Sequence, residues 1–190
     1  MKKIISFTGA SGSGKSTISD YLINNYPNFV LLPSYTTRER QDRDIEGEFI
    51  YLTLNEFSRR YDNEEFIWTA NPHGDDYYGT TFESLDNALI LPSYSLMCLV
   101  PGIMGKLADY VGEALLPFYI IPPPEQILRQ RLVNRGDDPE DIERRIYSCK
   151  FWLERAKKSD IDYVYILNEE EGIEPAVAQV IAEIERSELI

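Results

Sequence analysis

Residues 9–16 read Gly9-Ala10-Ser11-Gly12-Ser13-Gly14-Lys15-Ser16 and match the pattern G-x-x-x-x-G-K-[ST]. The apolar run 4–7 before this stretch predicts a buried strand, and the residues after it are expected to form a helix. Glycines let such a loop curl, so that successive N–H groups point inward and surround a phosphate. The alternative is a glycine-rich turn that binds nothing, and the strand–loop–helix context counts against it. The stretch therefore predicts a phosphate-binding loop.

The same pattern assigns roles within the loop. Lys15 is expected to reach the β- and γ-phosphates of a nucleoside triphosphate as a catalytic residue, and the Ser16 hydroxyl to bind Mg²⁺. The predicted cofactors are ATP and Mg²⁺. The residues expected to bind ATP through its phosphates are Gly9, Ala10, Ser11, Gly12, Ser13, Gly14, Lys15, Ser16 and Thr17.

Composition limits the classes of partner. The chain has 190 residues, with 19 basic and 32 acidic side chains and a net charge of −13. Such an acidic chain is not expected to bind nucleic acid, which requires a basic surface. No apolar stretch approaches the ~20 residues that a membrane span needs, so no membrane partner is expected. With only two cysteines, Cys98 and Cys149, the expected location is the reducing cytoplasm.

Strand-like and helix-like segments alternate along the chain. The helix expected at 138–158 starts with Asp138 as N-cap and Pro139 at its first position. Two further helices are expected at 125–134 and 174–188. Short apolar runs expected to form buried strands lie at 4–7, 29–32, 96–100, 117–121 and 163–167. This alternation predicts a single α/β domain, with a central parallel sheet between two layers of helices.

One region departs from the alternation. Residues 34–81 are rich in Tyr, Arg and acidic residues, with short extended runs at 49–52 and 66–70 and a helix expected at 55–61. We interpret this region as an antiparallel lobe inserted into a core formed by residues 1–33 and 82–190. A charged stretch at about 134–141, between two helices, is expected to be a short lid.

The absence of other motifs favours a small-molecule kinase. A GTPase of this type would carry N-K-x-D, and no Asn-Lys pair occurs in the sequence. The run 96–100, where an ATPase would end in an acid, is followed by Pro101-Gly102. A kinase also needs a second anion site, and the hydroxyls and guanidinium of Ser34-Tyr35-Thr36-Thr37-Arg38 suit an acceptor phosphate. The alternative is a polar turn with a solvated arginine.

Several motifs in order make the chain similar to the guanylate kinase family over nearly its whole length. They are the phosphate loop 9–16, the segment 34–38, Asp44-Ile45-Glu46-Gly47, Tyr78-Gly79-Thr80, the helical segment 123–136 and the run 163–168 that ends in Asn168. The resemblance implies a P-loop three-layer fold with a lobe that binds the acceptor. It also implies ATP-dependent phosphorylation of a nucleoside monophosphate, GMP or dGMP.

The resemblance also implies roles for individual residues. Arg131, Arg135 and Arg145 are expected to close over the transferring phosphoryl group, which makes them catalytic residues alongside the loop lysine. Asn168 is expected to lie near the donor adenine. The residues expected to bind the acceptor are Ser34, Arg38, Tyr78 and Thr80, with Phe49 or Tyr51 in place of the family's tyrosine.

Departures from the family pattern fall on the acceptor side. Gln41, flanked by Arg40 and Arg43, replaces a second arginine. Trp68 stands where the family has a glutamate that reads guanine, although a core aromatic is an equal interpretation. Gly102 stands where the family has a second carboxylate. These losses predict poor discrimination of guanine, unless Glu46, Glu48, Asp75 or Asp76 turns inward. His73 is expected to be a solvated loop residue and not a metal ligand.

Two alternatives to a nucleoside monophosphate kinase therefore stay open. One is a sugar phosphate kinase similar to ribose 1,5-bisphosphate phosphokinases, which share the fold and need no base. The other is a non-catalytic binding module of the guanylate kinase type. In each case the expected partner is a small phosphorylated molecule, and the chain is expected to be a monomer or a homodimer.

Overall fold

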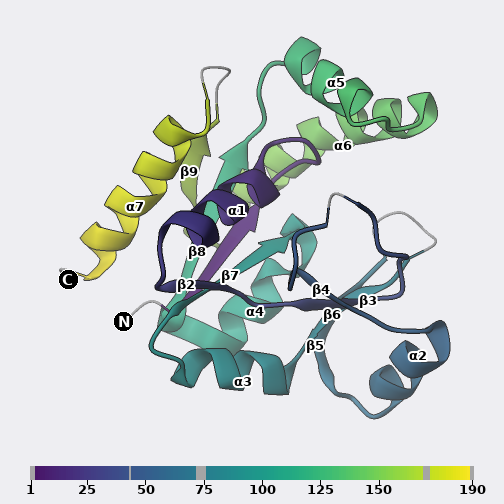
Figure 1. Ribbon diagram of the computed structural model, residues 1–190, viewed down its shortest axis with the longest axis vertical. Helices are drawn as coiled ribbons and strands as arrows, with labels where there is room; N and C mark the ends of the chain where they lie inside the picture. The colour runs from purple at the N-terminus through teal and green to yellow at the C-terminus, as the bar shows by residue number, and fades with distance from the viewer. Residues whose placement is uncertain (1–2, 43, 72–75, 169–171, 189–190) are drawn as a thin grey trace.

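The computed structural model describes residues 3–42, 44–71, 76–168 and 172–188. Its centre is a five-stranded sheet in the order β2-β7-β1-β8-β9, in which every neighbouring pair is parallel (Figure 1). The strands are β1 (Ile4–Thr8), β2 (Phe29–Leu31), β7 (Tyr94–Leu99), β8 (Leu115–Ile121) and β9 (Val164–Leu167). Each predicted apolar run falls on one of these strands, with ends that differ by no more than two residues. The predicted parallel sheet is confirmed.

Helices cover both faces of this sheet. Because side chains alternate along a strand, Ile5 and Phe7 of β1 join one apolar cluster and Ile4 joins another. The first cluster is closed by α1 and α7, and the second by α3, α4 and the end of α6. These helices are α1 (Lys15–Asn25), α3 (Phe82–Ile90), α4 (Met104–Val111), α6 (Pro139–Lys157) and α7 (Glu174–Glu188). The three-layer α/β/α prediction is confirmed. Among the described residues, no helix is both long and apolar enough to cross a membrane.

A second, smaller sheet is built from the segment 34–81, in the order β4-β3-β6-β5. Its strands are β3 (Ser34–Thr36), β4 (Phe49–Tyr51), β5 (Phe66–Ala70) and β6 (Tyr78–Thr81). As predicted, β6 is antiparallel to β3 and β5, but β3 and β4 are parallel. The expectation of a purely antiparallel lobe is therefore wrong for that pair. The connection 37–48 has about a dozen residues, which is long enough to return the chain in the same direction.

The lobe carries its own helix, α2 (Leu54–Asp62), where the sequence predicts 55–61. Thr53 caps it, because its side chain accepts from the Glu56 N–H while the Glu56 carboxylate accepts from the Thr53 N–H. Phe57, on the buried face of α2, stacks on Phe66 of β5, with ring centroids 4.6 Å apart. The lobe is thus a packed unit.

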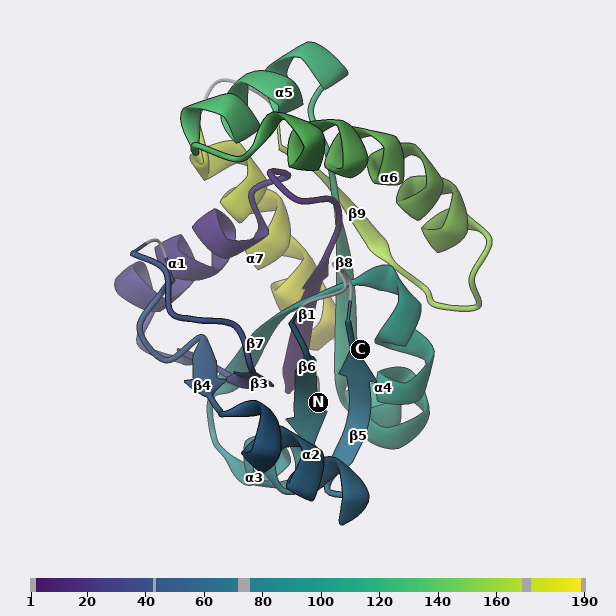
Figure 2. The same cartoon turned by 90° about the vertical axis from the view of Figure 1, so that its right-hand side faces the viewer.

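Two helices, α5 (Glu125–Asn134) and α6, form a pair above the phosphate loop (Figure 2). The bounds of α5 match the prediction, and Asp138 caps α6 by accepting from the Glu140 N–H at 2.9 Å. Between the pair lies a small apolar cluster that we call the lid core. Its members are Ala10, Leu128, Leu132, Ile142, Ile146 and Cys149. Ala10 belongs to the phosphate loop, so the helix pair packs directly on that loop.

Candidate active site

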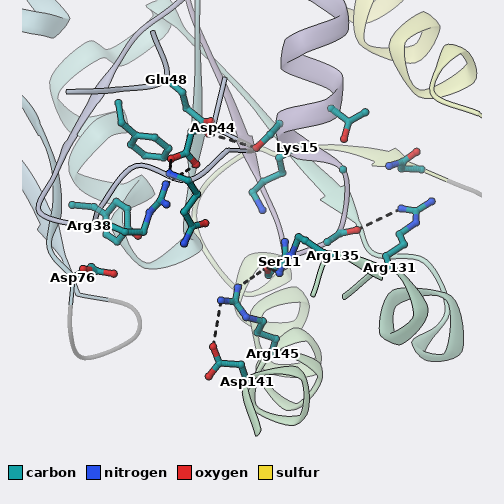
Figure 3. A pocket seen from close by; sticks show the side chains of 18 of the residues that line it. Ser11, Lys15, Arg38, Asp44, Glu48, Asp76, Arg131, Arg135, Asp141 and Arg145 are labelled. Carbon is teal, nitrogen blue, oxygen red and sulfur yellow. Dashed lines mark hydrogen bonds and ion pairs between the residues drawn. The ribbon is translucent and has the colours of Figure 1, made fainter. Parts of the chain in front are cut away.

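A cleft of about 930 Å³ opens between the phosphate loop, the small sheet and the α5–α6 pair. Its lining comes from the loop and the start of α1, from the lobe, from α5 and α6, and from the residues around the end of β9. Figure 3 shows Arg38 on the lobe side of the cleft, and Arg135 and Arg145 on the helix-pair side beyond Lys15. The fold therefore brings together segments that are far apart in the sequence.

The shape of the phosphate loop depends on glycine, most clearly at Gly14. This residue has a φ of 99°, and a Cβ there would lie 2.1 Å from Nδ2 of Asn168. Lys15 then begins α1, so the positive end of the helix dipole faces the loop. The Lys15 Nζ donates to the carbonyl oxygens of Gly9 at 2.8 Å and Ala10 at 2.9 Å. Burial lowers the pKa of this ammonium. The loop thus holds a cation at the place where the pattern puts the β- and γ-phosphates.

Asn168 forms a hydrogen bond with the backbone of the phosphate loop. It follows β9, is only 4% exposed, and donates from Nδ2 to the Ser13 carbonyl oxygen at 2.7 Å. The structure therefore places Asn168 against the phosphate loop, and it also contributes to the cleft lining. The buried side-chain amide of Asn168, directly after β9, thereby fixes the loop backbone that precedes α1.

The three arginines singled out in the sequence converge on the loop from the other side (Figure 3). Nη2 of Arg135 donates to the Ser11 Oγ at 3.0 Å, and Nη1 of Arg145 donates to the same atom at 2.7 Å. Nη1 of Arg131 lies 3.5 Å from the Gly12 carbonyl oxygen. Arg131 and Arg135 come from α5 and its C-cap, and Arg145 comes from α6.

Acidic neighbours hold these guanidinium groups in place. Asp137 lies in the connection between the two helices, is largely buried, and forms ion pairs with both Arg135 and Arg145. Asp141, one turn before Arg145 on α6, pairs with Arg144 and lies 3.9 Å from Arg145. The short connection between α5 and α6 thus supplies the counter-charge for the cations above the loop.

On the lobe side, Arg38 has its guanidinium fixed by Asp44. Nη2 of Arg38 lies 2.7 Å from Asp44 Oδ1, and the guanidinium lies over the Phe49 ring at 5.2 Å from its centroid. Asp44 also accepts from the Gln41 N–H and the Tyr51 hydroxyl, each at 2.8 Å. Burial opposes ionisation of Asp44, but the hydrogen bonds from Arg38, the Gln41 N–H and Tyr51 outweigh this effect and lower the pKa of Asp44. Burial and the bond to Asp44 raise the pKa of Tyr51 to about 12.

The predicted acceptor residues divide into two groups. Arg38, Phe49 and Tyr78 line the cleft. Ser34 and Thr80 are buried in the small sheet, with their hydroxyl oxygens 3.5 Å apart, and do not contribute to the cleft lining. Tyr51 is also outside the lining, and its hydroxyl donates to Asp44, which does line the cleft. Of the two candidates for the displaced tyrosine, Phe49 is therefore the one in the cleft, and it has no hydroxyl.

Trp68 is a core residue of the lobe, as the second interpretation held. It is 4% exposed, lies in the apolar cluster with Leu99 and Ile103, and faces Thr80 across the β5–β6 pair. Its Nε1 has no hydrogen-bond partner among the described residues. Gly102 brings no side chain at all. Neither position can present a carboxylate to an acceptor.

Several cleft residues were not assigned from the sequence. Asp44 stood in a quoted motif without a role, while Gln41, Asp141 and Arg144 had no acceptor or phosphate role. Of the acids proposed to turn inward, Glu48 and Asp76 line the cleft and Glu46 is exposed. Glu48 lies between the two halves: its Oε1 is 3.5 Å from the Ser16 Oγ, and burial raises its pKa. Arg43, His73 and Asp75 lie outside the described residues.

Comparison with known proteins agrees with this arrangement. The guanylate kinase family model matches residues 1–187. The guanylate kinase of Bacteroides thetaiotaomicron is 34% identical over 185 residues, which cover 95% of this chain and 89% of that protein. The Porphyromonas gingivalis guanylate kinase is 30% identical over 189 residues, covering 96% and 100%. A crystal structure of guanylate kinase from Anaplasma phagocytophilum shares the fold, with a TM-score of 0.69 at 23% identity, covering 98% of this chain and 85% of that one. The chain therefore belongs to the guanylate kinase family.

Proposed function

We propose that this protein transfers the γ-phosphoryl group of ATP to a nucleoside monophosphate, with GMP or dGMP as the acceptor. One observation carries the proposal: Lys15 and three arginines surround one part of the cleft, and Arg38 and Tyr78 line its opposite part. In phosphoryl transfer, negative charge spreads over the transferring oxygens, and cations fixed around them stabilise it. Membership of the guanylate kinase family supports the same activity.

On the donor side, the loop residues 9–16 and Thr17 bind the phosphates of ATP. Lys15 holds the β- and γ-phosphates, and Arg131, Arg135 and Arg145 offset the charge of the transferring group. These arginines already contact loop atoms, so little movement separates them from a phosphate in the loop. Asn168 fixes the loop and lies beside the donor nucleotide, near its adenine.

Mg²⁺ is proposed to accompany ATP, and the residues present suit it. The Ser16 hydroxyl, at the start of α1 beside the loop, supplies a hard oxygen ligand. Among the described residues no cluster of three or more acidic, histidine or cysteine side chains forms a cage, and nucleotide-bound Mg²⁺ needs none because it keeps several waters. When bound, the ion neutralises charge on the β- and γ-phosphates.

On the acceptor side, Arg38 and Tyr78 bind the acceptor phosphate and Phe49 lies against it. The phosphate competes with Asp44 for the Arg38 guanidinium, which can bind either anion through two N–H groups. Ser34 and Thr80 are buried in the small sheet, so a contact with the acceptor would require their hydroxyls to become exposed when the lobe closes. Tyr51 acts through Asp44, whose carboxylate it holds.

The proposed cycle includes closure of the lobe 34–81 and the lid at about 134–141 over the core. Closure would exclude water and complete the ring of cations. We further propose that the protein works in the cytoplasm as a monomer or homodimer, without nucleic acid or membrane. Its free thiols at Cys98 and Cys149 and its charge of −13 support that setting.

A sugar phosphate kinase acting on ribose 1,5-bisphosphate is the second candidate. It is favoured by Trp68, whose buried indole offers one donor and no acceptor where guanine would need acceptors for its N1–H and amino group. Gly102 cannot compensate. A base that is read by fewer polar groups is discriminated less strongly.

The test is kcat/KM for GMP, dGMP, AMP and ribose 1,5-bisphosphate with Mg²⁺-ATP, measured by ADP release. We expect GMP or dGMP to be the best acceptor, with a margin over AMP below about a thousandfold because a reading carboxylate is absent. A higher value for ribose 1,5-bisphosphate would assign the second candidate. Binding of ATP and GMP without turnover of any acceptor would show a non-catalytic module and contradict both kinase proposals.

A further inference from the structure

The central sheet does not supply the acid that usually accompanies a phosphate loop. In P-loop enzymes, Mg²⁺ is held by the loop Ser or Thr and by an aspartate on a neighbouring strand. Here β1 lies between β7 and β8. β7 continues into Val100-Pro101-Gly102, and β8 continues into three prolines. Within the described residues, neither strand brings a carboxylate to the loop.

The cleft itself contains four carboxylates among its described residues, and three of them have other positions or partners. Asp44 is bound by Arg38, Tyr51 and the Gln41 N–H. Asp141 is paired with Arg144 on the helix-pair side. Asp76 lies near Arg38, on the side of the cleft away from Lys15 (Figure 3). Only Glu48 remains beside the start of α1.

Glu48 is held so that one carboxylate oxygen faces the loop. Its N–H donates to the Ile45 carbonyl oxygen and its own carbonyl accepts from the Ser34 N–H, each at 3.0 Å. Its Oε2 accepts from the Ile45 N–H at 3.3 Å, while Oε1 lies 3.5 Å from the Ser16 Oγ. Two neighbouring ligands of an octahedral Mg²⁺ lie about 3 Å apart, because each Mg–O bond is about 2.1 Å. The pair is therefore near the separation that a shared ion requires.

We propose that Glu48 holds the nucleotide-bound Mg²⁺ together with Ser16, in place of an acid from the sheet. This inference rests on the proposed use of Mg²⁺-ATP, but not on the identity of the acceptor. Because Glu48 belongs to the lobe and Ser16 to the core, the ion links the two units. Metal binding and lobe closure therefore favour each other.

The experiment uses Mn²⁺ as the probe and a non-hydrolysable ATP analogue, without any acceptor. The dissociation constant of Mn²⁺ from the protein–analogue complex is measured by electron paramagnetic resonance for the wild type, Glu48→Gln and Glu46→Gln. Glu46 is an exposed acid in the same loop, so its substitution makes the same charge change away from Ser16. We expect Glu48→Gln to weaken Mn²⁺ binding at least about tenfold, because loss of a residue that only supports a metal ligand already costs about that much. We expect Glu46→Gln to change Mn²⁺ binding less than twofold.

Affinity for the analogue without metal separates a ligand from a structural residue. Removing a negative charge near the phosphates should leave this affinity unchanged or raise it. If Glu48→Gln weakens metal-free binding as much as Mn²⁺ binding, or if it matches Glu46→Gln, the proposal is overturned. Failure of GMP turnover would leave these results intact, whereas a wild type that binds no Mn²⁺–analogue would overturn both this inference and the proposed function.

Discussion

Replacing Gly14 by alanine should destabilise the protein, because the new methyl group has no space. The φ of 99° at Gly14 costs a residue with a Cβ about 1–2 kcal/mol. The Cβ would also lie 2.1 Å from Nδ2 of Asn168, so the Asn168 side chain must move and lose its 2.7 Å bond to Ser13. A lost buried hydrogen bond adds about 1–2 kcal/mol. The free energy of unfolding should fall by about 2–4 kcal/mol, and Tm by about 4–16 °C.

A double-mutant cycle with Asn168→Ala separates these two contributions. In the Asn168→Ala background the methyl group has space, so Gly14→Ala should cost only the backbone strain. The combined loss should therefore fall short of the sum of the single losses by about 1–2 kcal/mol. Urea unfolding of the ligand-free protein, followed by circular dichroism, measures all four variants. Gly102→Ala is the control, since a Cβ there meets no atom within 4 Å. Losses that add to within about 0.5 kcal/mol would refute the contact between Gly14 and Asn168.

Three other results are expected. Lys15→Ala should lower kcat for the best acceptor at least about 100-fold while unfolding like the wild type, and near-normal turnover would contradict the proposed role. Amide hydrogen exchange in the small sheet and in the α5–α6 connection should slow when a bisubstrate analogue binds, and unchanged exchange at saturation would contradict closure. The pKa of Asp44 lies below its usual 3.8, so its stabilising effect is full above that pH and disappears as pH falls through the folded value. Asp44→Asn should remove this part of the acid sensitivity of Tm as the pH falls below 3.8, and an unchanged profile would show that Arg38 does not stabilise the carboxylate.

Elements with strong local signals could be predicted from the sequence. The runs that became β1 and β8 are apolar on both faces because both faces are covered, and α6 shows its N-cap at Asp138 and its apolar stripe directly. The pairing of β3 with β4 carries no such signal. It depends on the path of residues 37–48, which local propensity does not encode.

In the candidate site, too, residues with a local sequence signal could be predicted, and residues placed by the tertiary arrangement could not. The phosphate loop follows from its spacing, and Arg131 and Arg135 share a helix face because they are four residues apart. The roles of these two arginines and of Arg145 come from the resemblance to the family. The lobe was harder to predict because a strand residue changes face with each step. Ser34 and Thr80 were therefore expected in the cleft but lie inside the small sheet. Glu48 was named only as one of four acids, because its position depends on how the lobe meets α1.

The lid core also affects the entropy of ligand binding. Arg131, Arg135 and Arg145 extend from helices joined by a shared apolar cluster, and their guanidinium groups are held by Asp137 and by loop atoms. A long side chain that becomes ordered only on binding costs about 0.5–1.5 kcal/mol. Three arginines ordered during folding therefore spare the bound state about 1.5–4.5 kcal/mol, which corresponds to roughly 10- to 1,000-fold in affinity for the phosphates.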